Sequence, residues 1–122
     1  MKLLLVEDNE ANRKLVRVLL RLKGHTAEEA VTAEEAIAAL EKMPAPDVVL
    51  LDIHIQGGGL TVASHTRSTP ALAGTTVIAL TALAMHGDRE RLLAAGCHGY
   101  ISKPIDVKTF VAEIEAICKP LP

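Results

Sequence analysis

The sequence predicts an α/β fold in which one domain, residues 1–122, forms a doubly wound, five-stranded parallel sheet with helices on both faces. Short apolar runs that suit buried strands alternate along the chain with amphipathic segments that suit helices. The alternation repeats as five βα units, and such units build parallel sheets through right-handed crossovers. A chain of 122 residues can also bury a core without disulfides or structural metals.

The strands are predicted where apolar residues follow one another without a polar break. Four runs show this clearly, and a fifth segment, 26–31, has a weaker pattern. In chain order the predicted strands are Leu3–Val6, Thr26–Val31, Val48–Leu51, Val77–Leu80 and Tyr100–Ile101. Strands that are apolar on both faces need helices on both sides of the sheet.

The first two helices are predicted between the first three strands. One covers Asn12–Leu22, where apolar residues share one helical face, and Gly24 favours its end. In the second, Thr32 and Glu35 form a capping box at the start, and Pro44 breaks the pattern. The expected buried face of the first helix carries Leu15, Val16, Leu19 and Leu22.

Three further helices are predicted, each with its own boundary signal. Leu60–Arg67 has a poor apolar stripe, and Asp88–Ala95 is short and ends at Gly96. Asp106 is the expected cap of the last helix. The apolar residues expected on its buried face are Val107, Phe110, Val111, Ile114 and Ile117.

Composition excludes several classes of function. The 13 basic and 15 acidic residues give a formal net charge of -2 without a basic stripe. One Tyr and one Phe are too few for base stacking, so we expect no direct binding of nucleic acid. No apolar run approaches the ~20 residues that span a bilayer, so we expect no membrane insertion. Cys97 and Cys118 suit buried or free thiols in a reducing compartment, which favours a cytoplasmic protein.

Polar residues follow the strong strands of the predicted sheet. The carboxyl ends of parallel strands meet at one edge, where open α/β sheets hold their ligands. Each polar residue taken singly could be only a helix cap, a turn residue or a solvated side chain. Five such residues at the ends of four predicted strands favour a site instead. They are Glu7, Asp8, Asp52, Thr81 and Lys103.

The residue types at this edge suit phosphoryl chemistry. Three converging carboxylates resist ionising together unless a cation neutralises them, and their oxygen atoms suit Mg²⁺. A carboxylate can attack phosphorus and form an aspartyl-phosphate if a metal and a cationic side chain hold the phosphoryl oxygens. Lys103 would be that cation, and the Thr81 hydroxyl could donate to a phosphoryl oxygen. The pattern therefore predicts phosphoryl acceptance.

Four stretches with matching order and spacing carry a family resemblance: Leu4–Asn9, Val49–Ile53, Ala79–Ala82 and Gly99–Ile105. Together they resemble a response regulator receiver domain over essentially the whole chain, as in single-domain receivers and hybrid sensor kinases. The resemblance implies a flavodoxin-like strand order of 2-1-3-4-5. It also implies a signalling protein of a two-component phosphorelay that assists only its own phosphorylation and dephosphorylation, and is not otherwise an enzyme.

The resemblance implies a role for each residue that would touch the phosphoryl group or the metal. Asp52 would be the phospho-acceptor, and Glu7 and Asp8 the acidic pair that holds Mg²⁺ with it, Asp8 more directly than Glu7. His54 matches the position whose main-chain carbonyl binds the metal. Lys103 matches the lysine that all family members carry beside the acceptor.

The resemblance also implies a switch. Thr81 would be the switch hydroxyl that turns toward the phosphoryl group, and Tyr100 the aromatic residue that then moves inward. The Lys103–Pro104 peptide would be cis, which aims the lysine at the site. The change would alter the surface formed by the fourth helix, fifth strand and fifth helix.

The implied partners are proteins. The phosphoryl donor would be the phosphohistidine of a sensor histidine kinase or of a histidine phosphotransfer protein, and the output would be binding to a downstream protein target. The sequence leaves open whether phosphorylation also drives dimerisation. It also leaves open whether the chain is a stand-alone receiver, which we expect, or the receiver of a hybrid kinase.

The loop after Asp52 departs from the family pattern. Receivers carry a proline in the position of Gln56 and a glycine eight positions after the acceptor, whereas Gly59 lies seven positions after it. We therefore expect a one-residue deletion here. The three glycines, 57–59, raise the entropy lost when the loop is ordered and let its backbone approach a neighbour closely.

Two other functions remain as alternatives. A degenerate receiver that acts as a phosphorylation-independent interaction module is favoured by the altered loop and opposed by the intact polar residues. A dehalogenase-type, Mg²⁺-dependent phosphatase would carry a second aspartate where His54 stands, and the absence of that aspartate argues against this function. No histidine pair has the spacing of a zinc site, so no imidazole is expected to bind metal among His25, His54, His65, His86 and His98.

Overall fold

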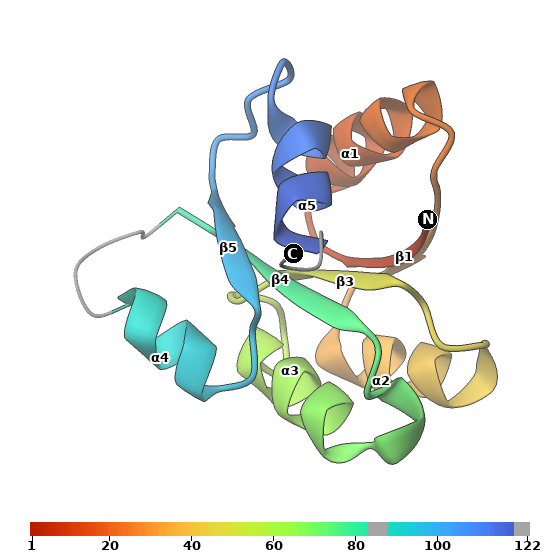
Figure 1. The fold of residues 1–122 in the computed structure, drawn as a ribbon, viewed down its shortest axis with the longest axis vertical. Helices are drawn as coiled ribbons and strands as arrows, with labels where there is room; N and C mark the ends of the chain where they lie inside the picture. Colours follow the sequence, from red (N-terminus) through yellow and green to blue (C-terminus); the bar gives the residue numbers. More distant parts are fainter. Residues whose placement is uncertain (83–87, 119–122) are drawn as a thin grey trace.

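The computed structural model describes residues 1–82 and 88–118 of the chain. Its strands form one parallel, five-stranded sheet in the order β2-β1-β3-β4-β5, which confirms the predicted fold class and strand order. Figure 1 shows this sheet running through the middle of the molecule. The strands are β1 (Lys2–Val6), β2 (Thr26–Ala30), β3 (Val48–Asp52), β4 (Thr76–Thr81) and β5 (Gly99–Ser102).

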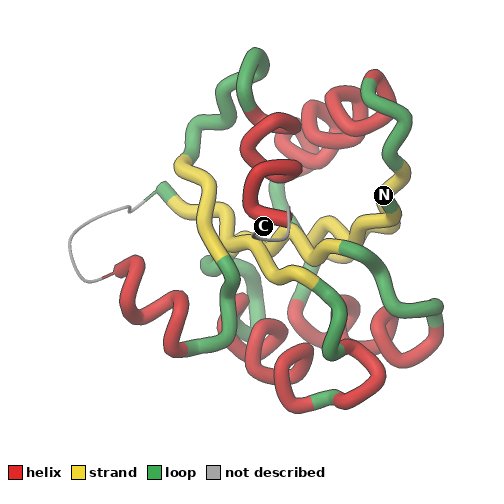
Figure 2. The backbone as a smooth tube through the Cα atoms, in the orientation of Figure 1, coloured by secondary structure: helices red, strands yellow, loops and turns green. Residues whose placement is uncertain are grey.

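Helices cover both faces of the sheet (Figures 1 and 2). One face carries α1 (Glu10–Leu22) and α5 (Phe110–Cys118). The other carries α2 (Ala33–Lys42), α3 (Gly59–Ser68) and α4 (Asp88–Ala94), and a short 3-10 turn at Pro70–Leu72 follows α3. In the described parts of the chain, no helix combines the length and the apolar character needed to cross a membrane.

The sheet divides the buried core into two halves. Side chains alternate along each strand, so Leu3 and Leu5 of β1 pack with α1 and α5, whereas Leu4 and Val6 pack with the helices of the other face. All five residues of β3 are buried. Because both faces of the central strands are covered, the functional polar groups are confined to the strand ends.

The first helix ends at Leu22, as predicted, but its start and the burial of its last residue differ from the prediction. It begins at Glu10 rather than Asn12, because the Asn9 side chain caps it by accepting a 2.9 Å hydrogen bond from the Asn12 N–H. The predicted burial of Leu22 is wrong, since 75% of this residue is exposed. The buried face of α1 is centred on Val16 and Leu20, and Leu22 points about 140° away from that centre at 100° per residue.

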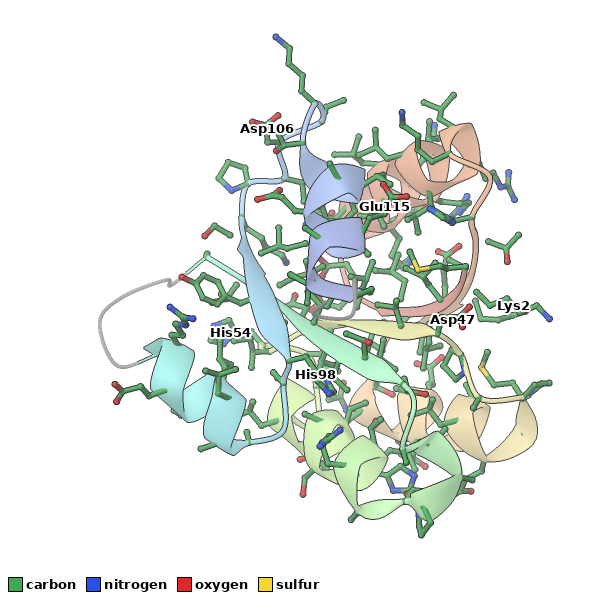
Figure 3. All side chains as sticks on the ribbon, viewed as in Figure 1. Lys2, Asp47, His54, His98, Asp106 and Glu115 are labelled. Atoms are coloured by element: carbon green, nitrogen blue, oxygen red, sulfur yellow. The ribbon has the colours of Figure 1, made fainter. Side chains whose placement is uncertain are left out.

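The last helix begins later than predicted. Asp106 does not cap it directly; its carboxylate accepts from the Lys108 N–H and its carbonyl from the Phe110 N–H, so residues 106–109 form a turn before α5. The predicted burial of Val107 is therefore wrong, because the residue lies in this turn and is 57% exposed. Figure 3 labels Asp106 in the turn and Glu115 within α5.

Both cysteines are free thiols, as predicted. Cys97 is buried and Cys118 is half-buried. Burial raises the pKa of the Cys97 thiol to about 11, so this thiol is protonated at neutral pH.

Candidate functional site

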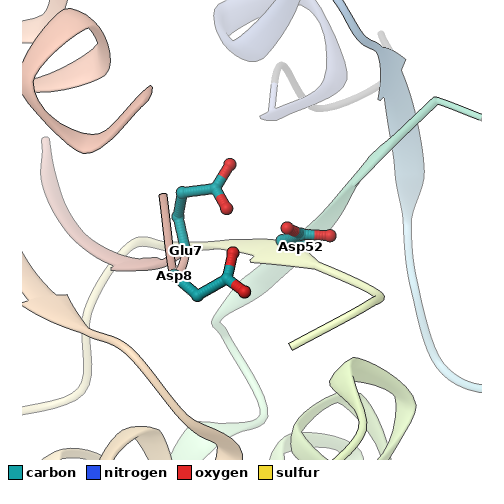
Figure 4. A group of neighbouring side chains, drawn as sticks. All are labelled: Glu7, Asp8 and Asp52. Atoms are coloured by element: carbon teal, nitrogen blue, oxygen red, sulfur yellow. The ribbon is translucent and has the colours of Figure 1, made fainter. Parts of the chain in front are cut away.

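The topology brings the three predicted acidic residues together. β1 and β3 are neighbours in the sheet, so Glu7 and Asp8, directly after β1, meet Asp52 at the end of β3. One carboxylate oxygen from each residue lies within 4.8 Å of the other two. Figure 4 shows the three carboxylates turned toward a common space. Glu7 is fully buried, Asp52 is buried and Asp8 is exposed, so the cluster opens to solvent on the Asp8 side.

Lys103 joins the two buried carboxylates. Its Nζ lies 2.7 Å from Glu7 Oε1 and 3.0 Å from Asp52 Oδ2. The Lys103 N–H donates a 2.8 Å hydrogen bond to the Thr81 carbonyl, which ties the end of β5 to the end of β4. The Lys103–Pro104 peptide is cis, as the resemblance implied. The ammonium group therefore acts as the counter-ion of a largely buried pair of acids.

The pKa values of these three groups shift in different directions. Burial and the hydrogen bond with Asp52 raise the pKa of Glu7, and nearby Lys103 offsets only part of this rise. Burial alone would raise the pKa of Asp52, but its hydrogen bonds with Glu7 and the His54 N–H, together with Lys103, lower it overall. Burial disfavours the charge on Lys103, yet the two carboxylates raise its pKa overall. The surroundings therefore favour the ionised form of Asp52 over that of Glu7.

Thr81 and Tyr100 lie on neighbouring strands close to this edge. Thr81 is the last residue of β4, is buried, and pairs with Ser102 in the register of the sheet. Tyr100 lies two residues before the end of β5 and is half-buried against the core on the α2, α3 and α4 face. The two residues are positioned by the adjacent strands β4 and β5.

His54 contributes its main chain rather than its ring to the site. Its N–H donates a 3.0 Å hydrogen bond to Asp52 Oδ1, and its side chain is exposed. Figure 3 labels His54 apart from His98. Of the five histidines, His86 lies outside the described residues. Within the described residues, the carboxylate cluster is the one group of three or more side chains suited to a metal, and no histidine belongs to it.

The loop after β3 is held tightly, and its glycines explain how. Gln56 pairs with α2 through its carbonyl, which accepts a 2.9 Å hydrogen bond from the Ala33 N–H. A Cβ at Gly57 would lie 2.8 Å from the Ala33 Cβ, and a Cβ at Gly59 would lie 2.5 Å from the Asp52 carbonyl oxygen. The bare backbone thus approaches the Ala33 side chain of α2 at Gly57 and the main chain after β3 at Gly59.

Two residues that contact the acidic pair were missed by the sequence analysis. The Asn12 Nδ2 donates to Glu7 Oε1 at 3.2 Å. The Arg13 NH1 donates to the main-chain carbonyls of Glu7 and Asp8 at 3.0 and 2.9 Å. Their sequence signal is weak, because a polar residue in the first turn of a helix is typical of any solvated face.

The donor set fits a divalent cation. All the side-chain ligands are carboxylate oxygens, which Mg²⁺ prefers, and one of them is exposed enough to leave coordination positions for water. The three carboxylates, when ionised, carry more negative charge than Lys103 neutralises. The residues that could hold the ion are Glu7, Asp8 and Asp52.

Comparisons with known proteins agree with this geometry. Residues 3–115 match the family model described as the response regulator receiver domain. The chain is 39% identical over 116 residues to the polar-differentiation response regulator DivK of Brucella anthropi, covering 93% of this chain and 92% of that protein.

Solved structures give the same result. The chain superposes on the receiver domain of a sensor histidine kinase from Pseudomonas aeruginosa PAO1 with a TM-score of 0.84, at 28% identity over 96% of each chain. That receiver domain has a magnesium ion coordinated in its active site cleft. The chemotaxis response regulator CheY4 of Vibrio cholerae shares the fold, with a TM-score of 0.89 at 24% identity over 95% of this chain and 97% of that one.

Proposed function

The chain belongs to the response regulator receiver family of two-component signalling, and we propose that it accepts a phosphoryl group on Asp52. The donor is the phosphohistidine of a sensor histidine kinase or of a histidine phosphotransfer protein. The observation that carries this proposal is the environment of Asp52. Its carboxyl group lies at the end of a central strand, 3.0 Å from the ammonium group of Lys103, and these surroundings lower its pKa.

In the transfer step an Asp52 carboxylate oxygen attacks phosphorus. A new O–P bond forms, the P–N bond of the phosphohistidine breaks, and the donor imidazole keeps the electron pair of that bond. The His54 N–H holds one Asp52 oxygen, and Lys103 neutralises charge on the other side of the carboxylate. These contacts orient the nucleophile before the donor arrives.

Mg²⁺ is the proposed cofactor. Glu7, Asp8, Asp52 and the main-chain carbonyl of His54 would hold it, and the ion would neutralise charge on the phosphoryl oxygens. The compactness of the carboxylate cluster supports this assignment. The magnesium ion in the Pseudomonas receiver domain supports it by analogy.

We propose that Thr81 and Tyr100 convert phosphorylation into altered binding of a downstream protein target. A phosphoryl group adds about -1.5 to -2 charge and three acceptor oxygens, enough to attract a nearby hydroxyl and ammonium group. Thr81 is buried at the adjacent strand end, and Tyr100 is half-buried one strand further along the sheet. Movement of either side chain alters the surface that β5 shares with its neighbouring helices.

The remaining features of the proposal follow from the same family membership. Residues 1–122 form a single receiver domain that acts through protein contacts and catalyses nothing beyond its own phosphorylation and dephosphorylation. Free thiols suit a reducing compartment, which supports a cytoplasmic protein. Dimerisation on phosphorylation is one form that the output could take.

The direct test is intact mass after incubation with Mg²⁺ and either acetyl phosphate or phosphoramidate. We expect one added phosphoryl group in the wild-type protein and none in Asp52→Asn. Asp47→Asn is the matched control, because Asp47 stands just before the same strand and accepts from the Lys2 N–H, away from the cluster. A wild-type protein that binds Mg²⁺ but takes no phosphoryl group from these donors or from a phosphohistidine donor would instead favour a phosphorylation-independent interaction module.

A further inference from the structure

We propose that Arg13 is a positioning residue that holds the main chain of Glu7 and Asp8 in the geometry that binds Mg²⁺. The inference rests on the metal site of the proposed function and extends it to a residue of α1 that coordinates nothing itself. Asn12, the residue before it, assists by holding the Glu7 side chain.

The contacts of Arg13 with the acidic pair are made to carbonyl oxygens. Its NH1 lies 3.0 Å from the Glu7 carbonyl and 2.9 Å from the Asp8 carbonyl. These two carbonyls belong to the segment between the end of β1 and the start of α1, outside both regular elements. One donor group that binds both fixes the two peptide planes, and these planes set the directions of the Glu7 and Asp8 side chains.

The other end of the guanidinium is also held. Its Nε lies 3.4 Å from Glu29 Oε1 on β2, and Glu29 is in turn held by Arg17 through bonds of 2.7 and 3.0 Å. The Arg13 side chain is only 17% exposed, which limits its freedom to leave this position. Arg13 therefore links an edge strand of the sheet to the turn that carries the acids.

The chemistry of this link suits arginine in particular. A guanidinium is planar and presents five N–H donors in fixed directions, so it can serve two carbonyls and a carboxylate together. A lysine ammonium in this place is a compact point charge on a flexible stem and would not fix the same peptide planes.

Asn12 adds a second constraint from the same helical turn. Its amide donates to Glu7 Oε1, the oxygen that also contacts Lys103. The main chain and the side chain of Glu7 are thus held by consecutive residues. The capping of α1 by Asn9 places both residues at the start of the helix, where they face the acidic pair.

Positioning by Arg13 and simple electrostatics predict opposite changes in Mg²⁺ affinity when Arg13 is replaced. Removing a positive charge near three carboxylates would, by Coulomb attraction alone, tighten the binding of a divalent cation. Loss of positioning weakens it, and loss of groups that orient metal ligands typically costs about 10- to 100-fold in affinity. The direction of the change therefore separates the two effects.

The experiment is isothermal titration calorimetry of the unphosphorylated protein with Mg²⁺. We expect Arg13→Met to raise the Kd by about tenfold. Lys14→Met is the matched control, because it removes an equal charge from the neighbouring position of α1, where the side chain is exposed; we expect its Kd to change by less than about twofold at physiological ionic strength. An Arg13→Met protein that binds Mg²⁺ as tightly as the wild type, or more tightly, overturns the proposal.

A second variant keeps the test decisive if Arg13→Met folds poorly. Arg13→Lys retains the charge without the planar donor set, and we expect weaker Mg²⁺ binding than in the wild type; an unchanged Kd overturns the proposal. Calorimetry needs no phosphoryl donor, so failure of phosphorylation at Asp52 and failure of positioning by Arg13 are seen separately. A wild-type protein that does not bind Mg²⁺ overturns this inference, whatever the mass measurement shows.

Discussion

Lys103 lies between two buried carboxylates, and its replacement should affect phosphoryl transfer and the response to phosphorylation to different degrees. Asp52 keeps its hydrogen bond from the His54 N–H when the lysine is removed, so the nucleophile remains oriented. The phosphoryl group, in contrast, loses the cation that would draw its oxygens toward β5. The contribution of Lys103 should therefore fall more on the response to phosphorylation than on the transfer itself.

We expect Lys103→Ala to take up some phosphoryl group but to show a smaller conformational response than the wild-type protein. The measurement is the change in backbone amide chemical shifts on phosphorylation, scaled to the phosphorylated fraction found by mass. Lys108→Ala is the control, since Lys108 is exposed in the turn before α5. Equal responses with and without Lys103 would contradict its assigned role.

The residues of the site differ in how far the sequence could predict them. Asp52 and Lys103 were predicted because each directly follows a recognisable strand, and parallel strands end at a common edge. Arg13 was not, because its contacts are with main-chain carbonyls, and any helix could place an arginine on a solvated face. The pattern of polar residues thus predicts groups that act through their position on the sheet, and misses groups that act on the backbone.

At the scale of the elements, the short loop between β3 and α3 depends on Gly59. This residue begins α3 directly beside the end of β3, and an added Cβ would meet the Asp52 carbonyl oxygen and, at 2.6 Å, the Ile53 Cα. Backbone atoms of a central strand cannot move aside as the tip of a flexible side chain can. A larger residue at position 59 must therefore displace either α3 or the end of β3.

We expect Gly59→Ala to lower the free energy of unfolding by about 3 kcal/mol, the upper part of the range for overpacked sites. Urea unfolding followed by circular dichroism measures this. Gly74→Ala is the matched control, because nothing lies within 4 Å of its Cβ position and its φ is not positive, so we expect little loss of stability or a small gain. If the two variants unfold at the same urea concentration, the close approach at Gly59 does not restrict the side chain at position 59 to hydrogen.

The elements themselves were predicted well where several signals agreed, and less well where one signal stood alone. The capping box at Thr32 marks the start of α2, and the Thr32 side chain accepts from the Glu35 N–H. Asp106 has the right residue type for a cap, but residues 107–109 form a turn before the helix begins, which its sequence does not distinguish from a first helical turn. The prediction that Leu22 is buried failed because the sequence of a single helix does not reveal the direction from which the sheet covers it.

For the whole molecule, the site imposes a cost on folding that depends on pH. The folded protein raises the pKa of Glu7 above its ordinary value of 4.5, so the folded state holds this proton more tightly than the unfolded state. The pKa of Asp52 is lowered from 3.8, so its contribution to stability is present above that pH and is lost only as the pH falls further. The two groups therefore act in separate pH ranges.

We expect Glu7→Gln to remove a decline in stability that the wild-type protein shows above pH 4.5. The favourable contribution of protonated Glu7 is complete below that pH and is lost as the pH rises through the folded pKa, whereas a glutamine does not titrate. The lowered pKa of His98, caused by burial and nearby Arg67, has the opposite effect near neutral pH, but it is common to both proteins and cancels in their difference.

The measurement is the free energy of unfolding in urea, without divalent cations, at a series of pH values from 4.5 to neutral. The difference between Glu7→Gln and wild type should shift in favour of the variant as the pH rises, because ionised Glu7 is a buried charge that Lys103 must share with Asp52. A difference that stays constant across the series would mean that Lys103 compensates both carboxylates fully, and that the acidic site places no pH-dependent cost on the fold.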